Sequence, residues 1–130
     1  MPNRPRLDEK SVTPAALSAM ESFRADVVRK VEETVVRDRV VVVGMAQNKH
    51  VRRARQALDE AGVTHTYLEY GSYIAKWRER LAIKLWSGWP TFPQVFVNGT
   101  LIGGEDLLKA ALADGSLKSS LGRVAESASA

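Results

Sequence analysis

Apolar residues in the first third of the chain recur every three or four positions, which is the period of an α-helix. The pattern starts behind Thr13 and Pro14, a hydroxyl residue that can cap a helix and a proline suited to its first turn. Residues 1–12 are polar, carry two prolines and show no period, so we expect a flexible arm. We expect one helical extension over residues 13–38, packed on a core through this stripe: Met20, Phe23, Val27, Val31 and Val35.

A run of four valines over residues 40–43 interrupts the helical pattern. Such a run is typical of a strand that is buried on both faces, so we expect residues 39–45 to form the central strand of a sheet. Helical spacing returns from about Lys49 and stops before Gly62, a residue suited to the left-handed end of a helix. The apolar positions of this second helix are Val51, Ala54 and Leu58.

Apolar and polar residues alternate around Tyr67 over residues 64–70, which predicts a half-exposed strand. Gly71 and Ser72 then turn the chain, and Ser72 can cap the helix that follows. The stretch "SGWPTFP" ends this third helix, and we expect its Trp77 to lie in the core. Its apolar stripe is Ile74, Trp77, Leu81 and Leu85.

Two short apolar runs flank the pair Asn98-Gly99, which readily takes the positive φ angles of a type I′ turn. This pattern predicts a hairpin of residues 94–97 and 100–103. A last helix follows Gly104 and ends near Gly115, and its stripe contains Leu107, Leu108, Ala111 and Leu112. We expect the Ser/Ala-rich tail, residues 118–130, to fray as a flexible end.

The order of these elements indicates the class of fold. A strand, a helix and a second strand require a parallel right-handed crossover, and the hairpin adds an antiparallel pair. We therefore expect an α/β domain with a four-stranded mixed sheet and helices on its faces.

The composition limits the possible functions mainly through the residue types that are absent or rare. The 130 residues suit one globular domain, and the net charge of +4 is too small to indicate a nucleic-acid partner. There is no membrane-length apolar run or secretory signal, so we expect a cytoplasmic protein without membrane contact. The absence of cysteine excludes disulfides and protein-thiol chemistry, and two histidines are too few for a zinc site without carboxylate help.

The loop "AQNKHV", residues 46–51, lies where a strand passes into the N-terminus of a helix. Free amides there favour an anion, and Lys49, His50, Arg52 and Arg53 add positive charge. A ligand's carboxylate, phosphate or thiolate would suit this loop, so we count Asn48 among the expected ligand-binding residues. The alternative is an ordinary solvated helix face on which Asn48 acts only as a cap.

Two stretches carry a resemblance to a known family. Residues 89–108, "WPTFPQVFVNGTLIGGEDLL", and the stretch "VVVVGMAQNKHVRRARQALDEAG" resemble glutaredoxins. The resemblance implies a thioredoxin fold over residues 39–117, and the Trp-Pro-Thr opening is similar to the monothiol branch.

The resemblance also implies a glutathione site. It places the Thr91-Phe92-Pro93 backbone beside the peptide like an added strand, with Pro93 cis. Further family positions match Gly103 and Gly104, which offer amides to a carboxylate, Asp106 for the ammonium group, and Lys84 for the glycine carboxylate. The alternatives are an ordinary loop, a plain helix-start acid at Asp106 and a surface charge at Lys84.

Three family positions have changed in this chain. Aligned without gaps, the two active-site cysteines fall on Asn48 and Val51, and a lysine that helps to bind glutathione falls on Met45. We therefore expect neither glutathione-dependent disulfide reduction nor a [2Fe–2S] cluster or other metal. The sequence leaves three functions open: a binding protein for glutathione or a related peptide thiol, an enzyme that uses the bound thiol as nucleophile with His50 as acid or base, and a protein-interaction module. It does not indicate the oligomeric state.

Overall fold

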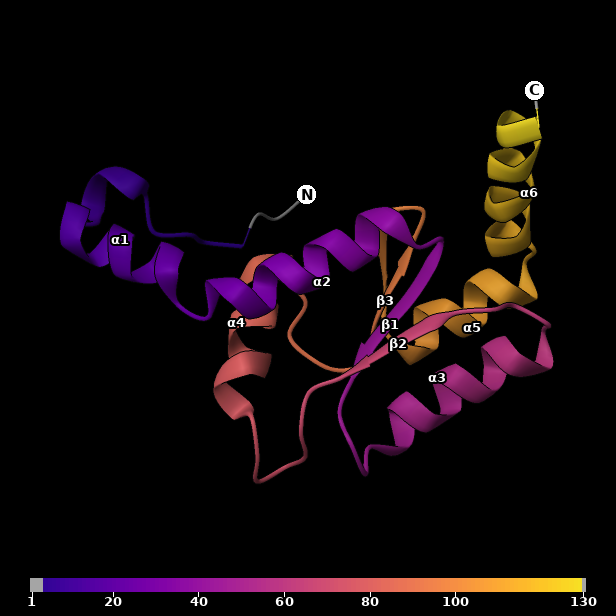
Figure 1. Cartoon of the computed structure of the whole chain (residues 1–130), viewed down its shortest axis with the longest axis horizontal. Coiled ribbons are helices and arrows are strands. Elements are labelled where there is room, and N and C mark those ends of the chain that lie inside the picture. Colours follow the sequence, from indigo (N-terminus) through magenta and orange to yellow (C-terminus); the bar gives the residue numbers. More distant parts are fainter. Residues whose placement is uncertain (1–3, 130) are drawn as a thin grey trace.

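The run of four valines lies in β1 (Val40–Gly44), one of the two inner strands of a four-stranded sheet in this computed structural model. The structure describes residues 4–129, and their side chains up to residue 122. Residues 1–3 of the expected arm and residue 130 of the expected tail lie outside it. The other elements are η1 (Glu9–Ser11), α1 (Pro14–Ser22), α2 (Ala25–Arg37), α3 (Lys49–Glu60), β2 (Thr66–Glu69), α4 (Trp77–Ser87), β3 (Gln94–Val97), β4 (Thr100–Gly103), α5 (Glu105–Ala113) and α6 (Ser116–Ser129) (Figure 1).

The strand order is β2-β1-β3-β4, which confirms the expected four-stranded mixed sheet. β1 runs parallel to β2, with Val42 opposite Tyr67, and antiparallel to β3, with Val42 also opposite Val95. The hairpin turn between β3 and β4 has positive φ at both central residues, 52° at Asn98 and 79° at Gly99. The Asn-Gly signal is thereby confirmed.

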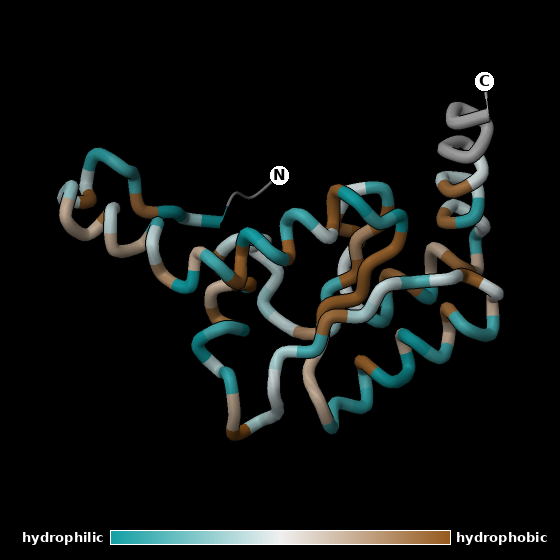
Figure 2. Tube along the Cα trace, viewed as in Figure 1, coloured by the Kyte–Doolittle hydropathy of each residue, from teal (hydrophilic) through white to brown (hydrophobic). Residues whose placement is uncertain are grey.

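Alternate valines of β1 face opposite sides of the sheet because side chains in a strand alternate. Val41 and Val43 pack with residues of α2 and α4, and Val40 and Val42 pack with residues of α3 and α5. The tube in Figure 2 is brown along β1, between the helical layers. Burying a valine side chain contributes about 2 kcal/mol, so this run is a main source of folding energy.

The expected single helix over residues 13–38 is wrong: the chain breaks at Arg24, whose φ is 47°. α2 carries buried Val31 and Val35, whereas α1 has no buried residue and its Met20 is exposed. Figure 1 shows α1 extending past the helix layer that covers the sheet. The stripe is continuous in sequence, but its first part has no sheet to cover.

The third helix begins at Trp77, five residues after the expected cap, and it buries a different face. Trp77 is 52% exposed, so its expected place in the core is wrong. The buried residues are Arg80, Ala82 and Ile83. The helix therefore packs against the core with a face that contains an arginine. The residues of the expected apolar stripe are exposed, at 94% for Ile74, 37% for Leu81 and 70% for Leu85.

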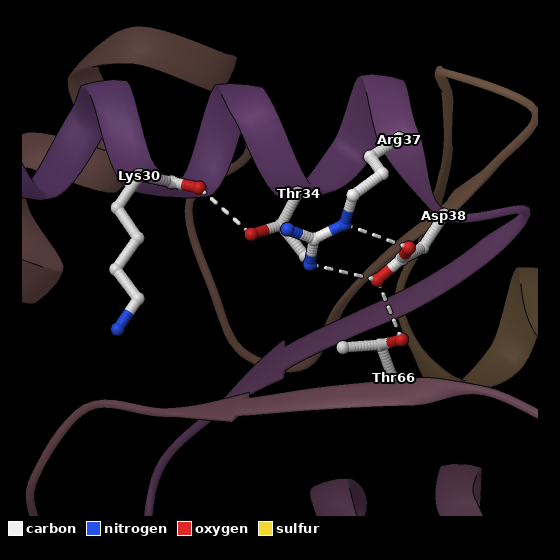
Figure 3. Close-up of polar contacts among 5 residues, drawn as sticks. All are labelled: Lys30, Thr34, Arg37, Asp38 and Thr66. Atoms are coloured by element: carbon white, nitrogen blue, oxygen red, sulfur yellow. Dashed lines mark hydrogen bonds and ion pairs between the residues drawn. The ribbon is translucent and has the colours of Figure 1, made fainter.

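A polar cluster fastens the end of α2 to the start of β2 (Figure 3). Arg37 donates from Nε and Nη2 to the two carboxylate oxygens of Asp38 at 3.0 and 3.2 Å. Thr66 donates from Oγ1 to Asp38 Oδ2 at 2.8 Å. The bonds from Arg37, and then that from Thr66, lower the pKa of Asp38, because both stabilise its charged form.

The end of the chain is helical where the sequence predicts fraying. Leu117 of α6 is buried and Leu121 packs against the α3 and α5 side of the core. Arg39 donates to the carbonyl oxygen of Leu121 at 2.7 Å, and Asn98 donates to that of Ser120 at 3.3 Å. The first turns of α6 are therefore attached to the domain.

Candidate functional site

Asn48 caps α3 with its side chain. Its Oδ1 accepts hydrogen bonds from the amides of His50 and Val51 at 2.9 and 3.1 Å, and the residue is buried. These are two of the amides that a helix leaves unsatisfied at its N-terminus. The amides predicted to favour an external anion are thus already satisfied by Asn48, which supports its role as a cap.

His50 points from the first turn of α3 to the first residue of α5. Its Nδ1 lies 2.7 Å from Oε1 of Glu105, and Oε2 of the same carboxylate lies 2.7 Å from Nζ of Lys109. The hydrogen bonds from Lys109, and next from His50, lower the pKa of Glu105. Glu105 is therefore anionic at neutral pH, and it joins two helix starts that are far apart in sequence. The sequence did not predict a role for Glu105 in the site, because by itself an acidic residue at the start of a helix is common.

The segment before β3 forms the second side of the candidate site. The peptide bond between Phe92 and Pro93 is cis, both side chains are buried, and Thr91 is exposed. Lys84 of α4 places its Nζ 5.6 Å from the centre of the Phe92 ring, close enough for a cation–π contact. Lys84 therefore lies beside the loop that contains Phe92 and Pro93.

The two glycines before α5 have different local requirements. Gly103 has a φ of 123°, and a Cβ there would lie 2.5 Å from Cδ1 of Leu107, so the position requires glycine. A Cβ at Gly104 would lie 3.4 Å from the carbonyl oxygen of Pro93. The start of α5 therefore lies against the Pro93 loop, and the exposed Asp106 follows on its first turn.

Two buried polar atoms beside this junction have no hydrogen-bond partner: Nε1 of Trp89 and Oε1 of Gln94. Gln94 uses its Nε2 to donate to the carbonyl oxygen of Trp89 at 3.0 Å. Leaving such an atom unsatisfied costs about 1–3 kcal/mol, so the segment before β3 is held by packing rather than by complete hydrogen bonding.

Arg80 of α4 is a further residue that supports the candidate site. It is buried, and its Nη1 donates to the carbonyl oxygens of Tyr70 and Ala75 at 3.0 and 2.5 Å. Ala46, just before the α3 loop, donates from its amide to the carbonyl oxygen of Gly71 at 2.7 Å. Arg80 thereby fixes a loop that supports the start of α3. Met45, the residue before Ala46, is part of the core.

Apart from Lys84 of α4, the candidate residues therefore come from three segments: the start of α3 with Asn48 and His50, the loop of Thr91, Phe92 and Pro93, and the start of α5. Gly104 contacts the loop, and Glu105 contacts α3. In the part of the chain that the structure describes, no group of three His, Asp or Glu side chains could hold a metal ion. Among the same residues, no helix has both the length and the apolar composition to cross a membrane.

Comparison with known proteins identifies a matching family and several relatives. The family model described as Glutaredoxin matches residues 40–102. A glutaredoxin-like protein of Dictyostelium discoideum is 54% identical over 87 residues, which cover 67% of this chain and 71% of the relative. A probable monothiol glutaredoxin of Legionella pneumophila is 36% identical over 66 residues, 51% of this chain and 71% of the relative.

Solved structures support the same relationship at the level of the fold. The crystal structure of a buckwheat glutaredoxin–glutathione complex is similar with a TM-score of 0.70 and 24% identity. The match covers 79% of this chain and 94% of the buckwheat chain. The thioredoxin-like architecture expected from the sequence is thus confirmed.

Proposed function

The chain belongs to the glutaredoxin family, and from this premise we propose that it binds glutathione or a related peptide thiol without performing thiol–disulfide exchange. The binding site is the junction of the α3 start, the Thr91–Pro93 loop and the α5 start. The observation that carries the proposal is that this junction is assembled in a chain with no cysteine.

The loss of exchange chemistry follows from the reaction itself. Thiol–disulfide exchange needs a thiolate that attacks a disulfide sulfur and forms a mixed disulfide. No residue in the 130 can supply that sulfur. A [2Fe–2S] cluster is likewise held by cysteine thiolates, so the residues of this chain do not fit one.

Several contacts support a peptide ligand at the junction. The Thr91–Pro93 main chain offers the edge along which an extended peptide can align. In this proposal the amides of Gly103 and Gly104 bind the carboxylate at one ligand end, and Asp106 pairs with the adjacent ammonium. Lys84, close to the Phe92 ring, binds the carboxylate at the other end. The buckwheat relative with the same fold was solved with glutathione, which supports this ligand class.

The experiment is a titration of the full chain with glutathione and, separately, with S-methylglutathione, followed by amide chemical shifts. S-methylglutathione keeps both charged ends but has no free thiol, so it measures the proposed groove alone. We expect both to bind, with shifts concentrated at the junction. If neither ligand changes the amide shifts at up to about 1 mM, the binding free energy is weaker than about −4 kcal/mol. This result would contradict the proposal and favour a protein-interaction module.

A matched pair of variants assigns the binding to the proposed residues. Asp106→Asn removes the charge for the ligand's ammonium and should weaken binding about tenfold, the loss of about 1.4 kcal/mol expected for one charged contact. Asp59→Asn makes the same change at the far end of α3, where the side chain is exposed, and should leave binding unchanged. Equal effects of the two changes would contradict the assignment.

The absence of exchange is tested with a glutathione-coupled reduction of hydroxyethyl disulfide. We expect no turnover above the rate of glutathione alone, because the chain cannot form the mixed disulfide. Turnover by the pure protein would overturn this part of the proposal while leaving the binding site intact. A cytoplasmic location stays a prediction of the sequence.

A further inference from the structure

We propose that His50, oriented by Glu105, is a general base that deprotonates the thiol of the bound peptide, so that the chain catalyses transfer of this thiol to an electrophilic carbon. The inference rests on the proposed function, because it needs the peptide thiol at the junction. It assigns a catalytic role to His50 and a positioning role to Glu105.

The contact between the two residues has the geometry of an oriented histidine. Nδ1 of His50 and Oε1 of Glu105 are 2.7 Å apart, and Glu105 is only 8% exposed. Lys109 holds the second carboxylate oxygen at 2.7 Å, so the carboxylate is fixed on both sides. A buried, anionic carboxylate can only accept a hydrogen bond, so the neutral ring carries its proton on Nδ1 and donates it to Glu105.

That tautomer leaves Nε2 with a free electron pair. The His50 side chain is 51% exposed, so about half of the ring's surface is open on the side away from the buried Glu105. A half-exposed ring with one nitrogen bound to a carboxylate is the arrangement by which proteins orient a histidine base. His65, by contrast, is 5% exposed, and its ring contacts Arg55, the carbonyl of Val63 and Asp59.

The position of His50 suits a peptide thiol at the proposed site. The Glu105 contact fixes His50 beside the start of α5, and Gly104, one residue earlier, lies against the Pro93 loop. A tripeptide that extends from Gly103 and Gly104 along this loop toward Lys84 has its cysteine in the middle. Its sulfur is therefore placed along the segment that His50 borders.

The chemical step needs no group that the proposal does not name. Nε2 of His50 accepts the thiol proton, and the sulfur uses the released electron pair to form a bond to the electrophilic carbon. With 1-chloro-2,4-dinitrobenzene, the carbon–chlorine bond breaks and chloride leaves with its electron pair. The proton passes from His50 to water, which returns the base to its starting form.

The test measures conjugation of glutathione with 1-chloro-2,4-dinitrobenzene by the full chain. General-base catalysis contributes about 10²–10⁴-fold, so we expect the natural chain to exceed glutathione alone by at least the lower value. His50→Gln should remove most of this acceleration. Its amide can still donate to Glu105, so folding is preserved, and binding of S-methylglutathione should be unchanged.

Glu105→Gln tests the positioning role through the split between kcat and KM. A neutral amide orients the imidazole less firmly, so kcat should fall by about tenfold or more while KM for glutathione stays the same. The matched control is His65→Gln, which removes the other histidine outside the proposed machinery and should keep both constants. Thermal unfolding of each variant checks that the fold is retained.

The outcomes separate this inference from the function on which it rests. If S-methylglutathione fails to bind the natural chain, the proposed function fails and the inference falls with it. If it binds but no acceleration occurs, or the acceleration survives His50→Gln, only the inference is overturned. The contact between His50 and Glu105 would then serve only to tie α3 to α5.

Discussion

The Oδ1 atom of Asn48 lies 3.1 Å from the amide nitrogen of Val51 and accepts its hydrogen bond. The amide of His50 donates to the same oxygen at 2.9 Å. The side chain of Asn48 thus takes the place of any anion at these two amides. A charged atom introduced at this position would receive the same donors and the positive end of the α3 dipole.

We therefore predict that Asn48→Cys creates a reactive thiolate. The two amides stabilise the charged form of a sulfur at position 48, which lowers its pKa and increases its thiolate fraction at neutral pH. The variant should react with a disulfide reagent faster than a free thiol and should gain turnover with hydroxyethyl disulfide and glutathione. Reaction rates against pH, followed by absorbance, measure both properties.

The control for this gain is Gln56→Cys, which places a thiol on the exposed middle of the same helix, away from free amides. It should react like an ordinary cysteine and show no turnover. Equal reactivity of the two variants would show that the start of α3 gives a sulfur no special environment.

The second prediction concerns α4, which buries a different face from the one that its apolar stripe predicts. Ile83→Ala should lower the free energy of unfolding by about 2–5 kcal/mol, because Ile83 is fully buried against α2 and the sheet. Leu85→Ala, two residues later, should change it by no more than about 0.5 kcal/mol, since this leucine is 70% exposed. Urea unfolding of both variants measures the difference. A larger loss at Leu85 would restore the arrangement expected from the apolar stripe.

Asp38 gives a prediction about pH. Its folded pKa is lowered from 3.8, first by the hydrogen bond from Arg37 and next by that from Thr66. A carboxyl group whose pKa is lower in the folded state than in the unfolded state stabilises the fold fully when the pH is above the unfolded-state pKa. This stabilisation is lost as the pH falls through the folded-state pKa. The gap in unfolding free energy between the natural chain and Asp38→Asn should therefore be largest at neutral pH and should shrink below 3.8.

Urea unfolding from neutral pH down through this range tests the prediction. Thr66→Val removes the hydrogen bond from Thr66 to Asp38 and keeps the bonds from Arg37 (Figure 3). The unfolding free energy of this variant should therefore differ from that of the natural chain in the same pH-dependent direction as that of Asp38→Asn, but by less. A gap between the natural chain and Asp38→Asn that is constant at every pH would mean that the carboxylate charge does not contribute.

The elements that the sequence predicted well are those set by local chemistry. The valine run of β1 has no polar face, so it is stable only between two layers, which is where it lies. The Asn98-Gly99 pair accepts positive φ at low cost and forms the hairpin turn. Asn48 caps α3 within its own first turn. Each of these signals acts over a few residues and needs no distant partner.

The candidate site was predicted only where residues are close in sequence or match the family. The segments around Pro93 and Gly104 carry recognisable sequences, whereas nothing in the sequence around Glu105 indicates its partner. Its role depends on His50, 55 positions away along the chain. The role of Arg80 likewise could not be predicted from the sequence, because a buried arginine needs the carbonyls of Tyr70 and Ala75 to be present.

By itself the sequence determined the order of the four strands and of helices α3, α4 and α5, the two-faced central strand and the absence of any protein thiol, because backbone preference, side-chain period and composition are properties of the chain alone. Only the tertiary structure decided where the N-terminal helix breaks, which face of α4 is buried and which charges meet at the α3 and α5 starts. These outcomes depend on which surfaces are available to cover a helix, and such surfaces exist only once the sheet has formed.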